Sequence, residues 1–153
     1  MACRNIVQVG NEILRKKSLP IEEINDEIIT LLDDMKETLT KADGVGLAAV
    51  QVGVLKRIFI VSVEEDYFEF INPVMIKQAG SQTDREGCLS IVKKSGLVER
   101  PNKVVIKAFN RQGQMYKLTA YGFLARAICH EYDHLDGILY TDKATDIRDE
   151  EWK

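Results

Sequence analysis

The chain has 153 residues, 45% of them hydrophobic and 29% charged, and its formal net charge is −3. This length suffices for one domain with its own hydrophobic core, and the negative charge argues against a protein built mainly to bind nucleic acid or an anionic membrane surface. Because no apolar run approaches the ~18 residues of a membrane span and the start lacks the apolar core of a signal peptide, we expect a cytoplasmic protein.

The first predicted element is a helix over residues 26–42. Apolar side chains recur there on one stripe with a period of 3.6 residues. Asn25 is a suitable N-cap, and Gly44 lies just past the end of the helix.

The stretch GVGLAAVQVG follows at residues 44–53. Its first residues fit the G-x-G-x-x-G/A fingerprint of a dinucleotide-binding loop. Such a loop must follow a strand and open a helix, because the helix N-terminus holds the pyrophosphate. Here a predicted helix precedes the glycines and a predicted strand follows them, so the context disfavours a nucleotide site.

Two strands and a hairpin of two more are predicted in the middle of the chain. The β-branched and apolar run at 57–63 is typical of a buried strand, and residues 67–78 predict another that Pro73 interrupts. Residues 103–120 predict a hairpin with Gly113 at its turn.

Residues 121–137 are helical in composition, with Gly137 at a C-terminal capping position. Residues 138–153 are expected to form a short C-terminal tail, polar from 141 onward, as a surface helix or a frayed end. Helices and strands do not alternate as in β-α-β units. We therefore predict a single α+β domain over residues 1–153, with mostly antiparallel strands.

The strongest chemical signal is the motif HEYDH at residues 130–134. Histidines four residues apart share one face of a helix, so both imidazoles can reach one metal ion. Glu131 then lies beside the ion, as in the H-E-x-x-H motif of metal-dependent hydrolases. The alternative is a pair of surface histidines, which the apolar neighbours of the motif disfavour.

Two protein ligands are too few for a catalytic metal site. Tyr140 occupies the position at which some zinc peptidases carry a third histidine. Among the cysteines, Cys88 in EGCLS is the best candidate ligand, although a buried structural thiol remains the alternative. Cys129 is better suited to the role of a buried structural thiol, because it points about 100° away from His130 on the helix, and Cys3 is near the terminus.

Three motifs in this order, GVGLAAVQ (44–51), EGCLS (86–90) and HEYDH, together resemble the peptide deformylase family. The resemblance extends from about residue 4 to about residue 140. It implies antiparallel sheets packed around a central helix that carries H-E-x-x-H, with an N-terminal helix. It also implies a hydrolase that removes the formyl group from the N-terminal formylmethionine of newly made polypeptides and releases formate.

The resemblance also implies a role for each matching residue. The metal ligands would be Cys88, His130 and His134, and the catalytic groups would be Glu131 as general acid and base, with Gln51 and the Leu89 N–H holding the oxyanion. The residues Gly44, Val45, Gly46, Phe123 and Ala127 would bind the substrate. The family commonly uses one Fe(II) ion, and zinc, nickel or cobalt can substitute.

Some positions depart from the family pattern. Val92 stands where a proline is usual, and Cys129 where glutamine is common. Arg126 is unusual for an apolar pocket, and we expect it at the pocket rim. Glu86 and Arg100 match a family pair that would brace the Cys88 loop, or they form a plain surface pair.

Two other functions remain possible from the sequence alone, namely another metallo-amidase or peptidase and a catalytically weak metal-binding homologue. The expected partner is a nascent N-formylmethionyl polypeptide. We expect a monomer that acts near the ribosome and has neither DNA nor a membrane as a partner.

Overall fold

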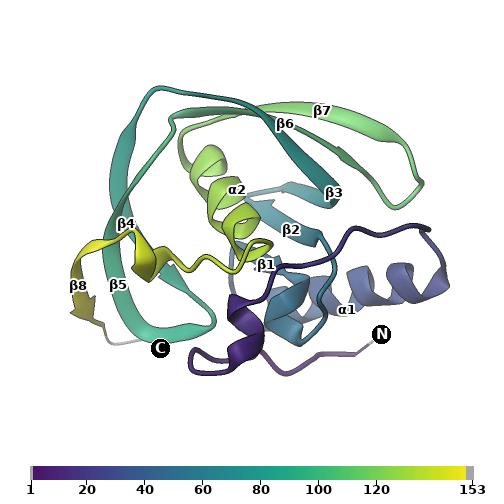
Figure 1. The fold of residues 1–153 in the computed structure, drawn as a ribbon, viewed down its shortest axis with the longest axis horizontal. Coiled ribbons are helices and arrows are strands. Elements are labelled where there is room, and N and C mark those ends of the chain that lie inside the picture. Colours follow the sequence, from purple (N-terminus) through teal and green to yellow (C-terminus); the bar gives the residue numbers. More distant parts are fainter. Residues whose placement is uncertain (1, 151–153) are drawn as a thin grey trace.

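The computed structural model describes residues 2–150, which contain two α-helices and two antiparallel β-sheets (Figure 1). The helices are α1 (Asp26–Ala42) and α2 (Gly122–His134), and short 3-10 helices span Glu12–Arg15, Ala49–Val52 and Tyr140–Asp142. The strands are β1 (Gly46–Ala48), β2 (Ile58–Val63), β3 (Asp66–Ala79), β4 (Gln82–Cys88), β5 (Ile91–Arg100), β6 (Lys103–Phe109), β7 (Met115–Tyr121) and β8 (Thr145–Asp149). The predicted α+β class is confirmed.

The larger sheet has the strand order β1-β2-β3-β6-β7, and the smaller has the order β4-β5-β8. Side chains alternate across the larger sheet. Ile58 and Ile60 of β2 pack with the buried face of α1, whereas Phe59 and Val61 belong to the core around α2. The sheet therefore separates the two helices, and α2 lies in the space between the two sheets (Figure 1).

The helix α1 has the bounds expected from the sequence. The Asn25 side chain accepts a hydrogen bond from the Ile28 N–H at 3.1 Å, and Asp43 ends the helix in a left-handed conformation with φ 54°. The helix α2 ends at His134, with Leu135 as its C-cap, and so is shorter than the predicted segment that Gly137 was expected to close.

Two expectations for the strands were wrong. Pro73 does not interrupt β3, because the pairing with β6 shifts register between Ile71 and Val74 and so accommodates a residue without an N–H. The polar tail forms neither a surface helix nor a frayed end over Thr145–Asp149, because these residues pair with β5 as β8. Residues 151–153 of the expected tail lie outside the described residues.

Residues 82–100 form β4 and β5, although no element was predicted there. These strands are rich in charged residues and mix buried with exposed positions irregularly, so no clear alternation of period two marks them. None of the helices within residues 2–150 is long and apolar enough to span a membrane.

Candidate metal centre and active site

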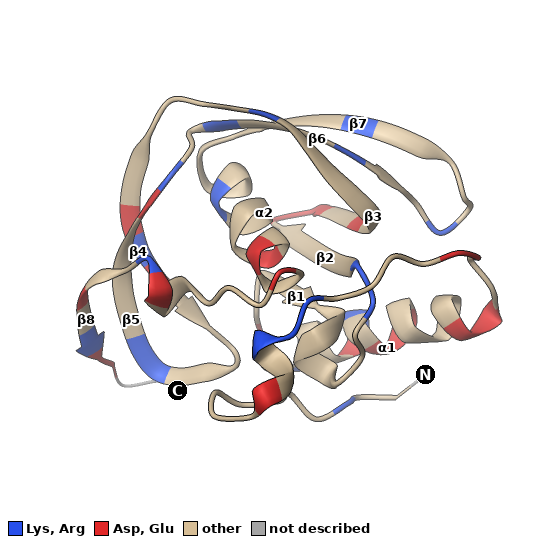
Figure 2. Cartoon of the chain, in the orientation of Figure 1, with Lys and Arg blue, Asp and Glu red and all other residues tan. Residues whose placement is uncertain are grey.

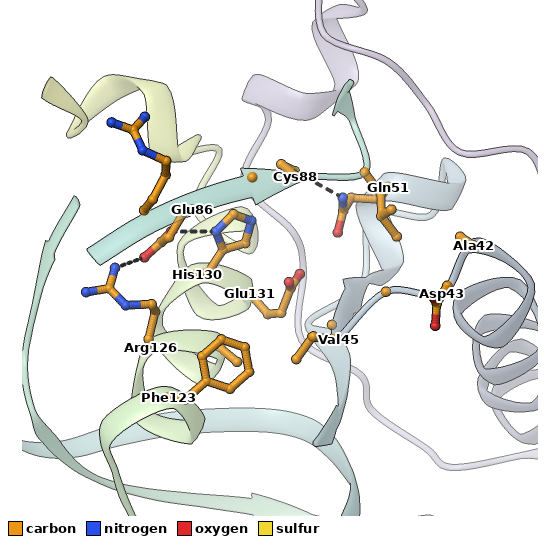
Figure 3. A pocket seen from close by; sticks show the side chains of 16 residues that line it. Ala42, Asp43, Val45, Gln51, Glu86, Cys88, Phe123, Arg126, His130 and Glu131 are labelled. Carbon is orange, nitrogen blue, oxygen red and sulfur yellow. Dashed lines mark hydrogen bonds and ion pairs between the residues drawn. The ribbon is translucent and has the colours of Figure 1, made fainter. Parts of the chain in front are cut away.

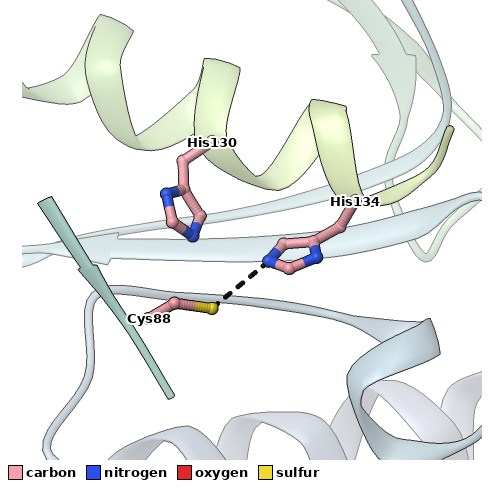
Figure 4. A group of neighbouring side chains, drawn as sticks. All are labelled: Cys88, His130 and His134. Carbon is pink, nitrogen blue, oxygen red and sulfur yellow. Dashed lines mark hydrogen bonds between the residues drawn. The ribbon is translucent and has the colours of Figure 1, made fainter. Parts of the chain in front are cut away.

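Three potential metal ligands converge from two elements. His130 and His134 lie one turn apart on α2, and Cys88 is the last residue of β4 (Figure 4). One ligand atom of each residue lies within 4.8 Å of the others, and all three residues are buried. The sulfur of Cys88 is 3.5 Å from Nε2 of His134. This arrangement of one thiolate and two imidazoles could hold a single metal ion.

Glu86 orients His130. Its carboxylate oxygen Oε1 accepts a hydrogen bond from Nδ1 of His130 at 2.8 Å, which leaves Nε2 of the ring free to face a metal ion. Burial alone would raise the pKa of Glu86, but the hydrogen bonds from His130 and Arg100 lower it to about 2. Glu86 is therefore ionised at neutral pH and selects the tautomer of His130 that carries its proton on Nδ1.

Arg126 does not lie at the pocket rim, and that expectation was wrong. Its side chain is only 4% exposed, and Nη1 donates to the Glu86 carboxylate and, at 3.0 Å, to the Val98 carbonyl. Arg100 donates to both oxygens of Glu86 at 2.9 and 3.0 Å, and also to Asp133 at 2.7 Å. The cost of burying a charged residue beside the pocket is offset by these pairings.

Glu131 follows the first histidine and faces the cavity. It is buried, and its oxygen Oε1 has no hydrogen-bond partner within the described chain. Burial raises the pKa of its carboxyl to about 7. A carboxyl group of this kind can exchange a proton with a reacting molecule near neutral pH.

Gln51 lies in the 3-10 helix that follows β1. Its oxygen accepts a hydrogen bond from the Ala48 N–H at 2.9 Å, and Nε2 donates to Ser90 Oγ at 3.0 Å and to the Cys88 sulfur at 3.6 Å. The amide N–H groups are thereby directed toward the candidate metal centre (Figure 3). Leu89, the residue after the cysteine, lines the same cavity.

The glycines of the GVGLAA stretch lie where β1 borders the cavity. A Cβ atom at Gly46 would lie 2.6 Å from Oε2 of Glu131, so the missing side chain makes room for that carboxylate. A Cβ atom at Gly44 would lie 2.9 Å from methyl groups of Leu39 and Leu89. Among residues 2–150, β1 pairs with β2 on one side only, so its other edge can accept an extended peptide.

The cavity has a volume of about 430 Å³ and is partly open to solvent. Phe123 and Ala127 of α2 line it together with Val45, so part of its wall is apolar. Arg85, which the sequence analysis did not single out, also lines it and forms an ion pair with Asp146 of β8 at 2.7 Å.

The remaining departures from the family pattern lie outside the ligand group. Val92 is 49% exposed. Cys129 is buried, and desolvation raises the pKa of its thiol to about 11. A thiol that stays protonated is a poor metal ligand, in agreement with the structural role expected for it.

Sequence reasoning missed two neighbours of the site. The Ser90 hydroxyl accepts a hydrogen bond from the Gln51 side-chain amide. Its position within the EGCLS motif is the sequence feature that could have identified it. Tyr140 stacks on the His130 ring with centroids 5.9 Å apart, and it occupies the position compared above with a third histidine. It packs on a candidate ligand and does not join the ligand group.

Comparison with known proteins agrees with this geometry. The family described as polypeptide deformylase matches residues 3–150. The peptide deformylase of Alkaliphilus metalliredigens is 54% identical over 143 residues, which cover 94% of this chain and 97% of that protein. The peptide deformylase of Acetivibrio thermocellus is 52% identical over 151 residues, which cover 99% of this chain and 89% of that protein.

Solved structures of the same name share the fold. The crystal structure of peptide deformylase from Thermotoga maritima superposes with a TM-score of 0.91 at 32% identity and covers 94% of this chain and 98% of that one. The crystal structure of peptide deformylase from Ehrlichia chaffeensis in complex with actinonin has a TM-score of 0.93 at 33% identity. It covers 95% of this chain and 91% of that one.

Proposed function

The chain belongs to the polypeptide deformylase family, and from this premise we propose how its own residues carry out the reaction of that family. The enzyme hydrolyses the N-formyl group of nascent polypeptides and releases formate. The observation that carries the proposal is the convergence of Cys88, His130 and His134 beside an unpartnered, buried Glu131.

We assign Cys88, His130 and His134 as the ligands of one divalent metal ion. The chemistry of these ligands supports the assignment, because a thiolate and two imidazoles suit iron, zinc, nickel and cobalt. It is also supported by the ionised Glu86, which leaves Nε2 of His130 as the available lone pair. We propose Fe(II) as the native ion, with zinc, nickel or cobalt as substitutes.

When bound, such an ion would supply Lewis acidity, lowering the pKa of a water molecule and stabilising negative charge on the formyl oxygen. Glu131 accepts a proton from the attacking water and later delivers it to the departing amine nitrogen. The C–N bond of the formamide breaks, and the water oxygen leaves in formate. Gln51 Nε2 and the Leu89 N–H donate hydrogen bonds to the developing oxyanion.

The substrate is positioned by the edge of β1. The backbone of Gly44–Gly46 borders the cavity, and an extended peptide would pair with it as an added strand. The methionine side chain would then lie against Val45, Phe123 and Ala127. This placement brings the formyl end of the peptide toward Glu131, whose carboxylate lies against Gly46.

We further propose that residues 1–153 act as a single catalytic domain, as a monomer in the cytoplasm and close to the ribosome. The continuous core around α2, with contributions from both sheets, supports one domain. Proximity to the ribosome follows from the substrate class, since nascent polypeptides are made there.

The test is formate release from formyl-Met-Ala-Ser by protein purified anaerobically and loaded with Fe(II). We expect release that a chelator abolishes and that does not occur with the acetylated peptide. If iron is the native ion, activity should decline in air, because iron and its thiolate ligand are oxidisable. Absence of release from folded, metal-loaded protein would refute the assignment.

A further inference from the structure

The outer face of strands β6 and β7, with the adjoining end of β3 after Ile71, is rich in lysine and contains no Asp or Glu. Residues 101–130 contain no Asp or Glu although the whole chain has a net charge of −3. Figure 2 shows basic segments and no acidic ones along β6 and β7. We call the surface formed by Lys77, Lys103, Lys107, Lys117 and Tyr121 the lysine face.

The sheet register places these side chains together. The buried residues Val104 and Ile106 of β6 face α2, so the alternate residues Lys103 and Lys107 face outward. Lys107 is directly opposite Lys117 on β7, and Lys103 is opposite Tyr121. The core beneath α1 is built mainly on β1 and β2, and its contacts on β3 and β6 are Tyr67, Ile71 and Phe109. The lysine face lies beyond these contacts, and its residues are exposed except Lys103, which is half-buried.

Neighbouring carboxylates do not compensate these charges. Within residues 2–150, the lysines that form ion pairs are Lys94 and Lys143, both outside this face. Like charges directly opposite each other on adjacent strands are destabilising. Lysine on an edge strand can prevent aggregation, which would explain Lys117 on β7. That explanation does not cover Lys107, because β6 is an interior strand.

We propose that the lysine face binds the phosphate backbone of single-stranded RNA. An external polyanion would relieve the repulsion between Lys107 and Lys117. Tyr121 is 58% exposed, with Nζ of Lys103 5.8 Å from its ring centre, and an exposed aromatic ring beside cations is suited to stacking a base. These features favour a nucleic-acid strand over a lipid surface.

The biological purpose of RNA binding by this enzyme rests on the proposed function. The nascent substrate is still joined to RNA when its N-terminus becomes accessible. Tyr121 precedes Phe123, which lines the active-site cavity, by two residues. RNA bound at the Tyr121 end of the lysine face would therefore lie near a residue that lines the cavity.

The test is fluorescence anisotropy with a labelled single-stranded RNA of mixed sequence and the metal-loaded enzyme. Four phosphate contacts predict about 50-fold weaker binding when salt rises from about 50 to about 200 mM, and two contacts predict about 7-fold. We expect the larger change for the unmodified protein and the smaller one for Lys107→Gln/Lys117→Gln. The matched control Lys16→Gln/Lys17→Gln removes two exposed lysines elsewhere and should retain the larger change.

Each other outcome overturns the inference. These outcomes are no RNA binding at low salt, an equal loss in the control variant, binding to anionic vesicles with no binding to RNA, and self-association through the face. Deformylation of formyl-Met-Ala-Ser is measured on the same preparations and should be equal in all of them. Normal deformylation without RNA binding would refute only the RNA site, whereas absent deformylation would refute the proposed function separately.

Discussion

One buried carboxylate, that of Glu86, connects the candidate metal centre to the surrounding sheet. It accepts hydrogen bonds from His130, Arg100 and Arg126, and its side chain is only 5% exposed. Because a buried charge is costly unless every part of it is paired, these donors keep the carboxylate in one orientation. The orientation of His130 therefore depends on Glu86 and its two arginine partners, which lie outside the ligand group.

Arg126→Met should weaken metal binding. The substitution retains an aliphatic side chain but removes a donor that fixes Glu86, and loss of a residue that supports a ligand typically lowers metal affinity about 10- to 100-fold. Equilibrium competition with a chelator measures the change, and Arg126→Lys should recover part of it. Arg15→Met, which removes an exposed ion pair with Asp142, should leave affinity unchanged. Equal affinities in all variants would contradict this positioning role.

Glu131→Gln should bind metal normally and lose at least about 100-fold in kcat, because a general acid and base typically contributes that much. Metal content and formate release are measured on the same sample. Near-normal turnover in this variant would remove the proposed role of Glu131.

Gly46→Ala tests the packing of β1 against Glu131. The new Cβ would require the carboxylate to move, because it would lie 2.6 Å from Oε2. We expect a lower kcat with a normal circular dichroism spectrum. Gly44→Ala meets only flexible leucine methyl groups and should act mainly on KM or stability. An unchanged kcat in Gly46→Ala would show that Glu131 functions equally well from another position.

Among the larger elements, α1 holds the N-terminal segment. Asp34 of this helix accepts hydrogen bonds from the Ala2 N–H at 2.7 Å and from Nε of Arg4 at 2.9 Å. The Ala2 hydrogen bond is the main cause of the lowered pKa of Asp34, and burial opposes it. The helix thus carries a charge that stabilises the fold only while it is ionised.

The pH dependence of stability follows from that lowered pKa. A carboxyl group with a folded-state pKa below its unfolded-state value stabilises the fold above the unfolded-state value, and loses this contribution as pH falls through the folded-state value. The free energy of unfolding should fall more steeply between about pH 5 and about pH 3 in the unmodified protein than in Asp34→Asn. Glu37→Gln, on the exposed face of α1, should keep the steeper fall. Parallel curves for all three proteins would exclude this contribution.

At the scale of the whole molecule, the candidate ligands join two separate parts of the fold. Cys88 ends β4 of the smaller sheet, whereas His130 and His134 belong to α2, which packs on the larger sheet. An ion bound by all three residues would therefore couple metal binding to the stability of the assembled domain.

Metal removal should lower the melting temperature. A ligand present at about 100 times its dissociation constant stabilises the folded state by about 2.7 kcal/mol. Differential scanning calorimetry with and without chelator should show this difference in the unmodified protein and in Cys129→Ser. The difference should be much smaller in Cys88→Ser. If the chelator lowered the melting temperature equally in the two cysteine variants, Cys88 would not be a ligand.

The elements that local pattern specifies were predictable from the sequence. Asn25 and the apolar period marked α1, and the spacing of His130 and His134 placed both on one helical face, because these signals depend only on neighbouring residues. The motifs also identified the family. The strands β4, β5 and β8 were missed because their charged residues show no alternation, and because β8 pairs with a distant segment, as Lys94 does with Asp149.

Tertiary structure alone decided how these residues meet. Sequence reasoning put Arg126 at a rim, whereas its burial depends on Glu86 and on Val98, which lie 40 and 28 positions away in the chain. The contact between Gly46 and Glu131 likewise joins a strand and a helix that no local pattern connects. Local sequence determines helical faces and donor types, because these depend on backbone periodicity and side-chain chemistry. Only the packed fold determines which buried charges are paired, because pairing depends on distances between distant segments.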